Sequence, residues 1–233
     1  PKDNIMILAV GRGPSGKPLT TKYEMRGDEE TVLEYGEAVA RIVRNVPNGT
    51  IVFFPAYQVM NRMLNTWNTY GVLGEIDAAV FIESPGSTAS LVDAYRKAAR
   101  EDKAVLFAVV RGKLSEGANF PDESGRAVVI VGIPYPNISD PRVMAQREYY
   151  DRVEESMGRR WYLDQSFNAV NQSLGRVWRH KEDYAVGVLL DTRYAWRESR
   201  RRLSPWLAER TTHVDPRTPF QTVERMIRAF FKG

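Results

Sequence analysis

Short apolar segments recur along the chain at intervals that suit the strands of one sheet. They are nearly continuous, not alternating, and most are rich in valine and isoleucine. Such segments are typical of strands that are buried on both faces, as in a parallel sheet. The pattern predicts six buried strands, at residues 5–10, 50–54, 79–83, 104–110, 127–133 and 185–190.

Between these segments, apolar residues recur at the spacing of amphipathic helices. Alternation of strands and helices predicts an α/β fold with a doubly wound, mostly parallel sheet and helices on both faces. No repeat or linker interrupts the pattern, so we expect residues 1–233 to form a single domain. The predicted helices cover residues 28–46, 57–70, 87–102, 140–156, 161–180, 192–202 and 219–231.

The composition excludes several kinds of chemistry. The 233 residues include no cysteine, so disulfides, thiolate catalysis and cysteine–metal sites are excluded. The two histidines, His180 and His213, are too few and too far apart to indicate a metal site, and we predict none. No apolar run is long enough to cross a bilayer, so no membrane association is expected. Because the sequence starts at Pro1 without a methionine, we expect a fragment of a larger protein.

Charge is distributed unevenly along the chain. Residues 1–140 carry 15 basic and 17 acidic side chains, whereas residues 141–233 carry 18 basic and 12 acidic ones. Sixteen of those 18 basic residues are arginine. An arginine-rich half favours a phosphate or nucleic-acid partner, although a solvated basic surface is nearly as common.

The most informative segment is the predicted helix over residues 161–180. At helical spacing, Gln172, Gly175, Arg176 and Arg179 share one face, and an apolar stripe occupies the opposite face. Arginine remains charged at physiological pH, and its planar fork suits phosphate oxygens. This face therefore predicts an anion contact, and the alternative is an ordinary solvated basic face.

Two features resemble nucleotide-binding motifs without matching them. Residues 11–18 follow a predicted strand and match the phosphate loop except at the last position, where Pro18 replaces the hydroxyl residue. Since Pro14 and Pro18 also remove backbone amides, a surface turn is the better interpretation. Asp191 follows another predicted strand, and we interpret it as a helix cap or as the ion-pair partner of Arg193.

Two polar segments are predicted at the carboxyl ends of strands, where α/β proteins bind ligands. Phe54 at the end of one strand and Tyr57 in the turn after it could contact a phosphate or a base, although at least one of Phe53 and Phe54 should belong to the core. The second segment, residues 110–120, interleaves two glycines with cations and polar groups. This variety favours a ligand-binding loop over a plain surface loop.

Four segments of the chain resemble the second motor domain of superfamily 2 iron–sulphur, XPD-like DNA helicases. In chain order they are residues 52–57, 109–120, 131–143 and 169–194. The regulator-of-telomere-elongation branch is the most similar, and the chromosome-cohesion and Fanconi-anaemia branches are close. The resemblance spans nearly the whole chain and implies a RecA-like fold. It also implies that the near-match at residues 11–18 is not a phosphate loop.

The resemblance gives the motif residues roles. Gln172, Arg176 and Arg179 match motif VI, whose arginines reach the γ-phosphate of ATP across a cleft between two motor domains. The other motifs imply nucleotide contacts for Glu116, Gly117, Asn119 and Gly175, and contacts with single-stranded DNA for Phe54, Tyr57, Arg111, Lys113 and Ser115.

The chain departs from the family pattern at Ala56, where serine is usual, and at Asn119, where aspartate is usual. The resemblance further implies that ATP with Mg²⁺ is bound mainly by an N-terminal motor domain that this sequence lacks, together with any iron–sulphur cluster. We expect a monomeric fragment, inactive alone, from a nuclear helicase. The alternatives are a non-catalytic nucleic-acid-binding module and a phosphate-loop NTPase that uses residues 11–17.

Overall fold

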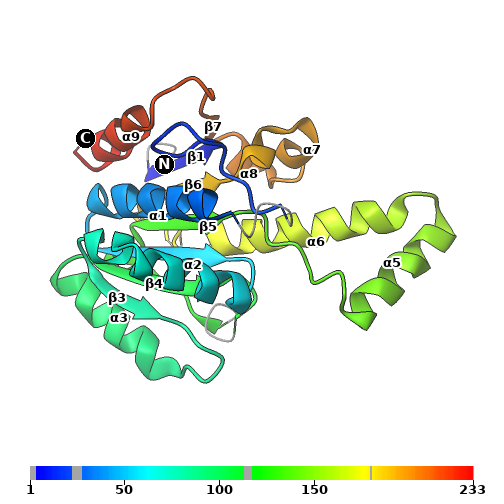
Figure 1. Ribbon diagram of the computed structural model, residues 1–233, viewed down its shortest axis with the longest axis horizontal. Helices are drawn as coiled ribbons and strands as arrows, with labels where there is room; N and C mark the ends of the chain where they lie inside the picture. Colours follow the sequence, from blue (N-terminus) through cyan, green and yellow to red (C-terminus); the bar gives the residue numbers. More distant parts are fainter. Residues whose placement is uncertain (1–3, 23–27, 113–116, 179, 233) are drawn as a thin grey trace.

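The computed structural model describes residues 4–22, 28–112, 117–178 and 180–232, and its centre is a parallel sheet (Figure 1). All strand pairs are parallel, so the predicted sheet type is confirmed. The seventh strand, β7, was not predicted because its three residues are polar. In spatial order the strands are β3 (Ala79–Ile82), β4 (Ala104–Val109), β2 (Gly49–Phe54), β5 (Ala127–Val131), β6 (Ala185–Leu190), β1 (Ile5–Val10) and β7 (Thr211–His213).

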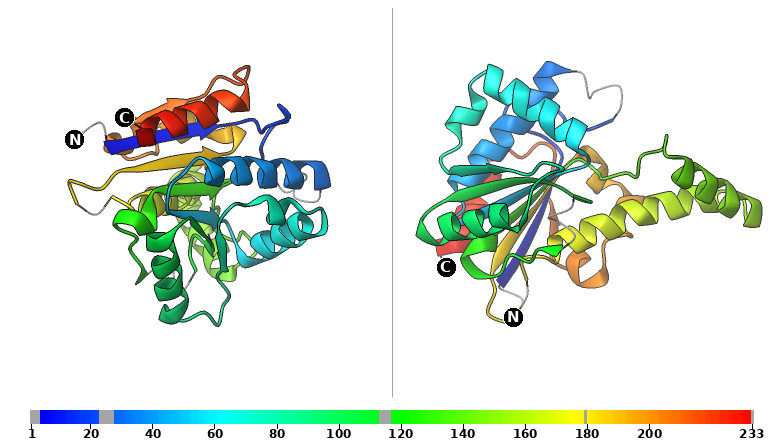
Figure 2. Two further views of the ribbon diagram at one scale, coloured as in Figure 1. Left: turned by 90° about the vertical axis from the view of Figure 1, so that its left-hand side faces the viewer. Right: turned by 90° about the horizontal axis from the view of Figure 1, so that it is seen from below.

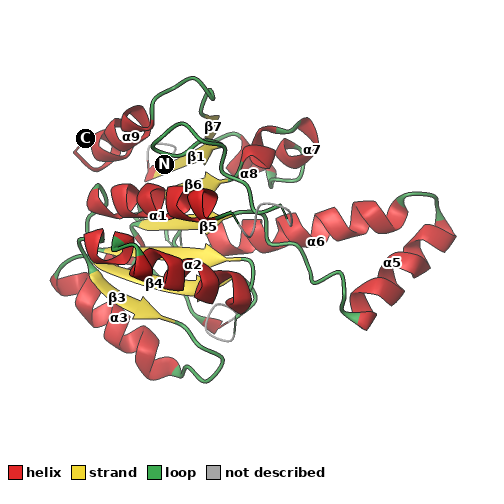
Figure 3. Ribbon diagram, in the orientation of Figure 1, coloured by secondary structure: helices red, strands yellow, loops and turns green. Residues whose placement is uncertain are grey.

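Helices cover both faces of this sheet, as expected for the doubly wound fold (Figure 3). Side chains alternate between the faces along each strand, and two apolar cores result. One core joins the sheet to α1 (Glu29–Arg44), α2 (Tyr57–Thr69) and α9 (Phe220–Lys232). The other joins it to α3 (Ala89–Glu101), to the second half of α6 (Met157–Leu174) and to α8 (Pro205–Ala208).

A helical arm extends from the sheet. It consists of α5 (Pro141–Val153) and the first half of α6, and Figure 1 and the right view of Figure 2 show it projecting away from the body of the domain. None of the residues of α5 is buried, whereas α6 buries Ser166, Phe167, Val170 and Leu174 near its end. The arm is thus anchored to the core through the end of α6. No helix in the described ranges is long and apolar enough to span a membrane.

The end of α6 corrects one prediction. The helix stops at Leu174, so Arg176 does not continue a helical face that begins at Gln172. Gly175 caps the helix with its N–H on the carbonyl of Asn171, and the chain then turns. Glycine is a poor helix former, and the carbonyl of Arg176 bonds outside the helix. Arg179 lies outside the described residues.

Of two further segments, one differs from its prediction and one agrees with it. The helix expected over 192–202 is split at Trp196 into a 3-10 helix, Thr192–Ala195, and α7 (Arg197–Arg200). Residues 11–18 form a turn that is closed by a bridge between Arg12 and Pro18 and by a bond from the N–H of Gly13 to the carbonyl of Lys17. The side chain of Lys17 pairs with Glu30, and the interpretation of this segment as a surface turn is confirmed.

Candidate functional site

Arg176 is bonded to the segment that leads from β4 to β5. Its Nη1 donates a hydrogen bond of 2.8 Å to the carbonyl oxygen of Ala118. Its own carbonyl oxygen accepts the backbone N–H of Phe120 at 3.0 Å. Arg176 stays half-buried, and Gly117 and Asn119 are exposed on the adjoining backbone. The structure therefore brings together Arg176 with Gly117 and Asn119, residues more than fifty positions away in sequence.

Close packing holds this contact in place. Phe120 is buried against the ring of Tyr95, with ring centroids 5.8 Å apart. Gly125 lies so close to the carbonyl of Phe120 that an added Cβ would come within 2.0 Å of its oxygen and 2.7 Å of Val177. A side chain at position 125 would push the two segments apart, so glycine is required there for steric reasons.

The other residues predicted to contact the nucleotide are distributed around this contact. Gln172 is exposed on the last turn of α6, and Gly175 is half-buried at the end of that helix. Glu116 lies outside the described residues, as do Arg179 and two residues predicted to contact DNA, Lys113 and Ser115.

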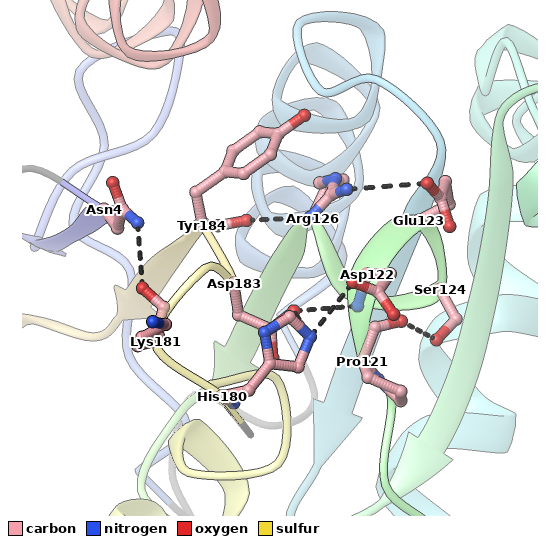
Figure 4. Close-up of polar contacts among 10 residues, drawn as sticks. All are labelled: Asn4, Pro121, Asp122, Glu123, Ser124, Arg126, His180, Lys181, Asp183 and Tyr184. Carbon is pink, nitrogen blue, oxygen red and sulfur yellow. Dashed lines mark hydrogen bonds and ion pairs between the residues drawn. The ribbon is translucent and has the colours of Figure 1, made fainter. Parts of the chain in front are cut away.

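Asp122, His180 and Asp183 form a polar cluster that the sequence did not reveal (Figure 4). The carboxylate of Asp183 accepts the backbone N–H of Asp122 at 2.9 Å and that of His180 at 3.1 Å. The Nε2 atom of His180 lies 3.1 Å from Asp122 and 3.2 Å from Asp183. Among the described residues these three could offer a metal ion one ligand atom each. Asp183 already accepts two amides, and the prediction of no metal remains a prediction.

Phe54 corrects a predicted contact. The side chain is fully buried, with its ring centroid 5.9 Å from that of Trp67 and 6.0 Å from that of Phe107. It therefore has no surface with which to contact DNA. Phe53 is also buried, in the core on the opposite face of the sheet. Both phenylalanines belong to the core because β2 is central and covered on both sides.

Tyr57, by contrast, is half-buried at the start of α2. Its hydroxyl donates to Oε1 of Glu83 at 2.9 Å, and Oε2 of Glu83 accepts the backbone N–H of Val109 at 2.9 Å. Glu83 is 1% exposed, so the carboxylate joins the ends of three strands from inside the protein. Gly112 approaches so closely that an added Cβ would lie 2.5 Å from Oε1 of Glu83. The sequence analysis missed Glu83 because its partners are distant in sequence.

Arg111 is exposed at the carboxyl end of β4 and is tied to the arm. Its two terminal nitrogens donate to backbone carbonyls, Nη1 to Pro134 at 3.1 Å and Nη2 to Gln165 at 2.9 Å. The segment that starts at Arg111 thus contacts α6 at one end and Arg176 at the other, through Ala118. One stretch of chain therefore connects the arm to the contact between Arg176 and Ala118.

A groove of 760 Å³ lies between the turn after β2 and the arm. Residues 55–59 and Arg111 form one wall, which includes the ring of Tyr57. The opposite wall comes from the loop after β5 and from both helices of the arm, through Asn137, Arg142, Trp161 and Tyr162. We call this space the arm groove.

Asp191 forms the ion pair that was expected. Its carboxylate caps the 3-10 helix at the N–H of Arg193 and accepts two bonds of 2.7 Å from the guanidinium of Arg193. Both side chains are buried, and Arg193 also donates to Thr21. Burial by itself lowers the pKa of Arg193, but hydrogen bonding to Asp191 and its negative charge outweigh burial and raise the pKa. The pair is structural, and Asp191 is not available as a metal ligand.

Comparison with known proteins identifies the family that these motifs indicated. Residues 39–210 match the family model of the helicase C-terminal domain. The chain belongs to this family. The predicted resemblance is confirmed, and so is the RecA-like α/β fold that it implied.

Relatives of this helicase C-terminal domain are much longer proteins. The chain is 36% identical over 232 residues to the ATP-dependent DNA helicase chl-1 of Caenorhabditis elegans, a match that covers 98% of this chain and 28% of the relative. It is 37% identical over 221 residues to the regulator of telomere elongation helicase 1 of Mus musculus, covering 88% of this chain and 18% of the relative. A solved XPD helicase superposes with a TM-score of 0.66 at 25% identity, over 90% of this chain and 35% of that one.

Proposed function

We propose that this helicase C-terminal domain is the second motor domain of an ATP-dependent DNA helicase. In this proposal it supplies arginine side chains to ATP that is held mainly by a first motor domain, and it guides single-stranded DNA. The observation that carries the proposal is the segment from Arg111 to Phe120, which contacts the arm groove at one end and Arg176 at the other. A motor needs such a connection because ATP hydrolysis has to change the grip on DNA.

Arg176 and Arg179 are the proposed contacts with the γ-phosphate, together with Gln172. A guanidinium group stabilises the negative charge that spreads over the phosphoryl oxygens in the transition state. Glu116, Gly117, Asn119 and Gly175 are the proposed neighbours of the nucleotide. The hydrogen bond from Arg176 to the carbonyl of Ala118 supports this proposal, because it holds one cationic side chain beside the exposed backbone of this segment.

Tyr57 and Arg111 are the proposed contacts with single-stranded DNA, with Lys113 and Ser115 on the same segment. The exposed guanidinium of Arg111 and the ring of Tyr57 line one wall of the arm groove and support this proposal. Phosphate contacts from arginine position a strand, and stacking on an aromatic ring binds bases without sequence preference.

The expected cofactors are divided between this chain and the rest of the protein. The residues around Arg176 suit phosphate oxygens, whereas Mg²⁺ needs carboxylate or other oxygen ligands, so we assign Mg²⁺ mainly to the first motor domain. The chain has no cysteine to ligate an iron–sulphur cluster, and any cluster would belong to another part of the protein. We further propose that the helicase acts in the nucleus and that the isolated domain is monomeric.

An ATPase assay tests this proposal. The isolated chain should show negligible hydrolysis, because half of the phosphate site is missing, and the full-length protein should hydrolyse ATP in a DNA-dependent manner. Hydrolysis by the isolated chain at a rate near that of the full-length protein would contradict the proposal. If Lys17→Ala abolished that activity, the phosphate-loop alternative would be correct.

A further inference from the structure

We propose that the arm groove is a binding track for single-stranded DNA and that the α5–α6 arm forms its outer wall, with Trp161 as a base-stacking contact and Arg142 as a phosphate contact. This inference rests on the proposed function and extends it to Trp161, which lies outside the motif segments, and to Arg142, to which no role was assigned.

The first argument is the arrangement of aromatic rings. Tyr135 and Tyr162 line the groove as a stacked pair, with ring centroids 5.6 Å apart and planes inclined by 5°. Trp161 lines it as well and is backed by Tyr150 at 5.8 Å and 27°. Rings that are held in place by a second ring lose little conformational freedom when a base stacks on them. Aromatic platforms of this kind bind the bases of single strands.

The second argument is charge. Among the described residues, three charged ones line the groove, and two of them, Arg111 and Arg142, are cationic. The third, Asp140, caps the N-terminus of α5 by accepting the backbone N–H of Arg142 at 2.8 Å. Its negative charge is therefore partly balanced by the positive end of the helix dipole. Cations on both walls complement a phosphate backbone that passes between them.

The third argument is continuity. The lining of the groove joins the turn after β2, where Tyr57 is proposed to contact DNA, to the arm, and Arg111 belongs to the same lining. Arg111 also fixes the arm, through its bond to the carbonyl of Gln165. In addition, α5 packs on α6, with Tyr150 on Trp161, and buries none of its own residues, so its outer surface remains accessible. A strand bound at Tyr57 would therefore share one groove with Arg142 and Trp161.

The experiment measures binding of a fluorescein-labelled oligo-dT to the full-length protein by fluorescence anisotropy at several salt concentrations. Trp161→Ala should raise the Kd about tenfold without changing the salt slope, because it removes a stacking contact and no charge. Trp161→Phe should restore most of the affinity. Arg142→Gln should weaken binding and reduce the salt slope by about one. The control is Trp196→Ala, because Trp196 is 50% exposed and does not line the groove.

Trp161→Ala and Arg142→Gln variants that bind as tightly as Trp196→Ala would overturn the inference. If loss of the indole unfolds the protein, Arg142→Gln decides alone, since Arg142 is exposed and its side chain can be replaced without a core defect. A wild-type protein that neither binds oligo-dT nor hydrolyses ATP would instead refute the proposed function. Wild-type activity with unaffected arm variants would refute only the track and leave the groove for a protein segment.

Discussion

Tyr57 and Glu83 are joined by a hydrogen bond of 2.9 Å that connects the turn after β2 to the end of β3. Because β4 lies between these two strands, the bond passes over its end, and the N–H of Val109 in β4 donates to the same carboxylate. One buried carboxylate thereby fixes the ring that is proposed to contact DNA.

Replacing Glu83 should therefore affect both stability and binding. Glu83→Ala leaves the N–H of Val109 and the hydroxyl of Tyr57 without this acceptor, and we expect a loss of about 1–3 kcal/mol in the free energy of unfolding. Oligo-dT should also bind more weakly, although Glu83 itself is buried. Urea denaturation and anisotropy measure the two effects. Glu75→Ala, at an exposed position, is the matched control, and an equal effect in both variants would contradict the role of Glu83.

Gly125 provides a test of the contact between the segment 117–120 and Arg176. Gly125→Ala places a methyl group against the carbonyl of Phe120 and against Val177, and overpacking of this kind costs about 1–3 kcal/mol. ATP hydrolysis by the full-length protein should fall as well, because the two segments are pushed apart. In Gly74→Ala the added methyl group meets no atom within 4 Å, so this variant should retain wild-type stability and activity. Equal melting curves for the two variants would argue against the close approach.

The buried ion pair between Asp191 and Arg193 is expected to be essential for folding. Asp191→Ala leaves a buried guanidinium group without its partner, and such a loss costs about 3–5 kcal/mol. Asp215→Ala removes the carboxylate from an exposed pair with Arg217 and should leave the urea midpoint nearly unchanged. If both variants unfolded at the same urea concentration, the pair of Asp191 and Arg193 would contribute no more than a surface ion pair.

His213 should make stability dependent on pH. Burial, and then the charge of Arg200, lower its pKa below the ordinary value of 6.5. The unfolded chain therefore binds a proton before the folded protein does, and the free energy of unfolding should decrease as the pH falls through about 6.5. In His213→Gln this decrease should be smaller, as measured by urea denaturation at pH values on both sides of 6.5. A wild-type protein and variant with the same pH dependence would contradict the assignment.

The sheet could be predicted from the sequence because parallel strands are continuous apolar runs. The prediction of burial was wrong for β3, which lies at the edge of the sheet and exposes Val80 and Ile82. Six of the seven strands have the apolar pattern. The polar strand β7 does not, because it is held only at the edge of the sheet beside β1. The end of α6 could not be predicted by spacing alone. Gln172 and Arg176 fit a helical repeat, but a bond to Phe120, far away in sequence, ends the helix early.

The residues of the candidate site could be proposed only in part from the sequence, for a similar reason. Motif order indicated Tyr57, Arg111 and Arg176, which the structure places on or beside the two proposed surfaces. Motif order could not show that Phe54 is buried while Tyr57 is partly exposed. Phe54 belongs to β2, a central strand that is buried on both faces, whereas Tyr57 lies at the start of α2. Glu83 and Asp183 were missed because each acts through partners brought together only by the fold.

The most direct test of the central claim, that this domain supplies arginines to ATP bound by another domain, is single-turnover ATP hydrolysis by the full-length protein carrying Arg179→Ala. The matched control is Arg12→Ala, whose guanidinium bonds within the surface turn at residues 11–18. The account predicts a fall in the hydrolysis rate of about 10³-fold or more, with an unchanged Kd for oligo-dT and a normal rate in the control. Normal hydrolysis in Arg179→Ala, with weaker DNA binding and a reduced salt slope, would contradict it.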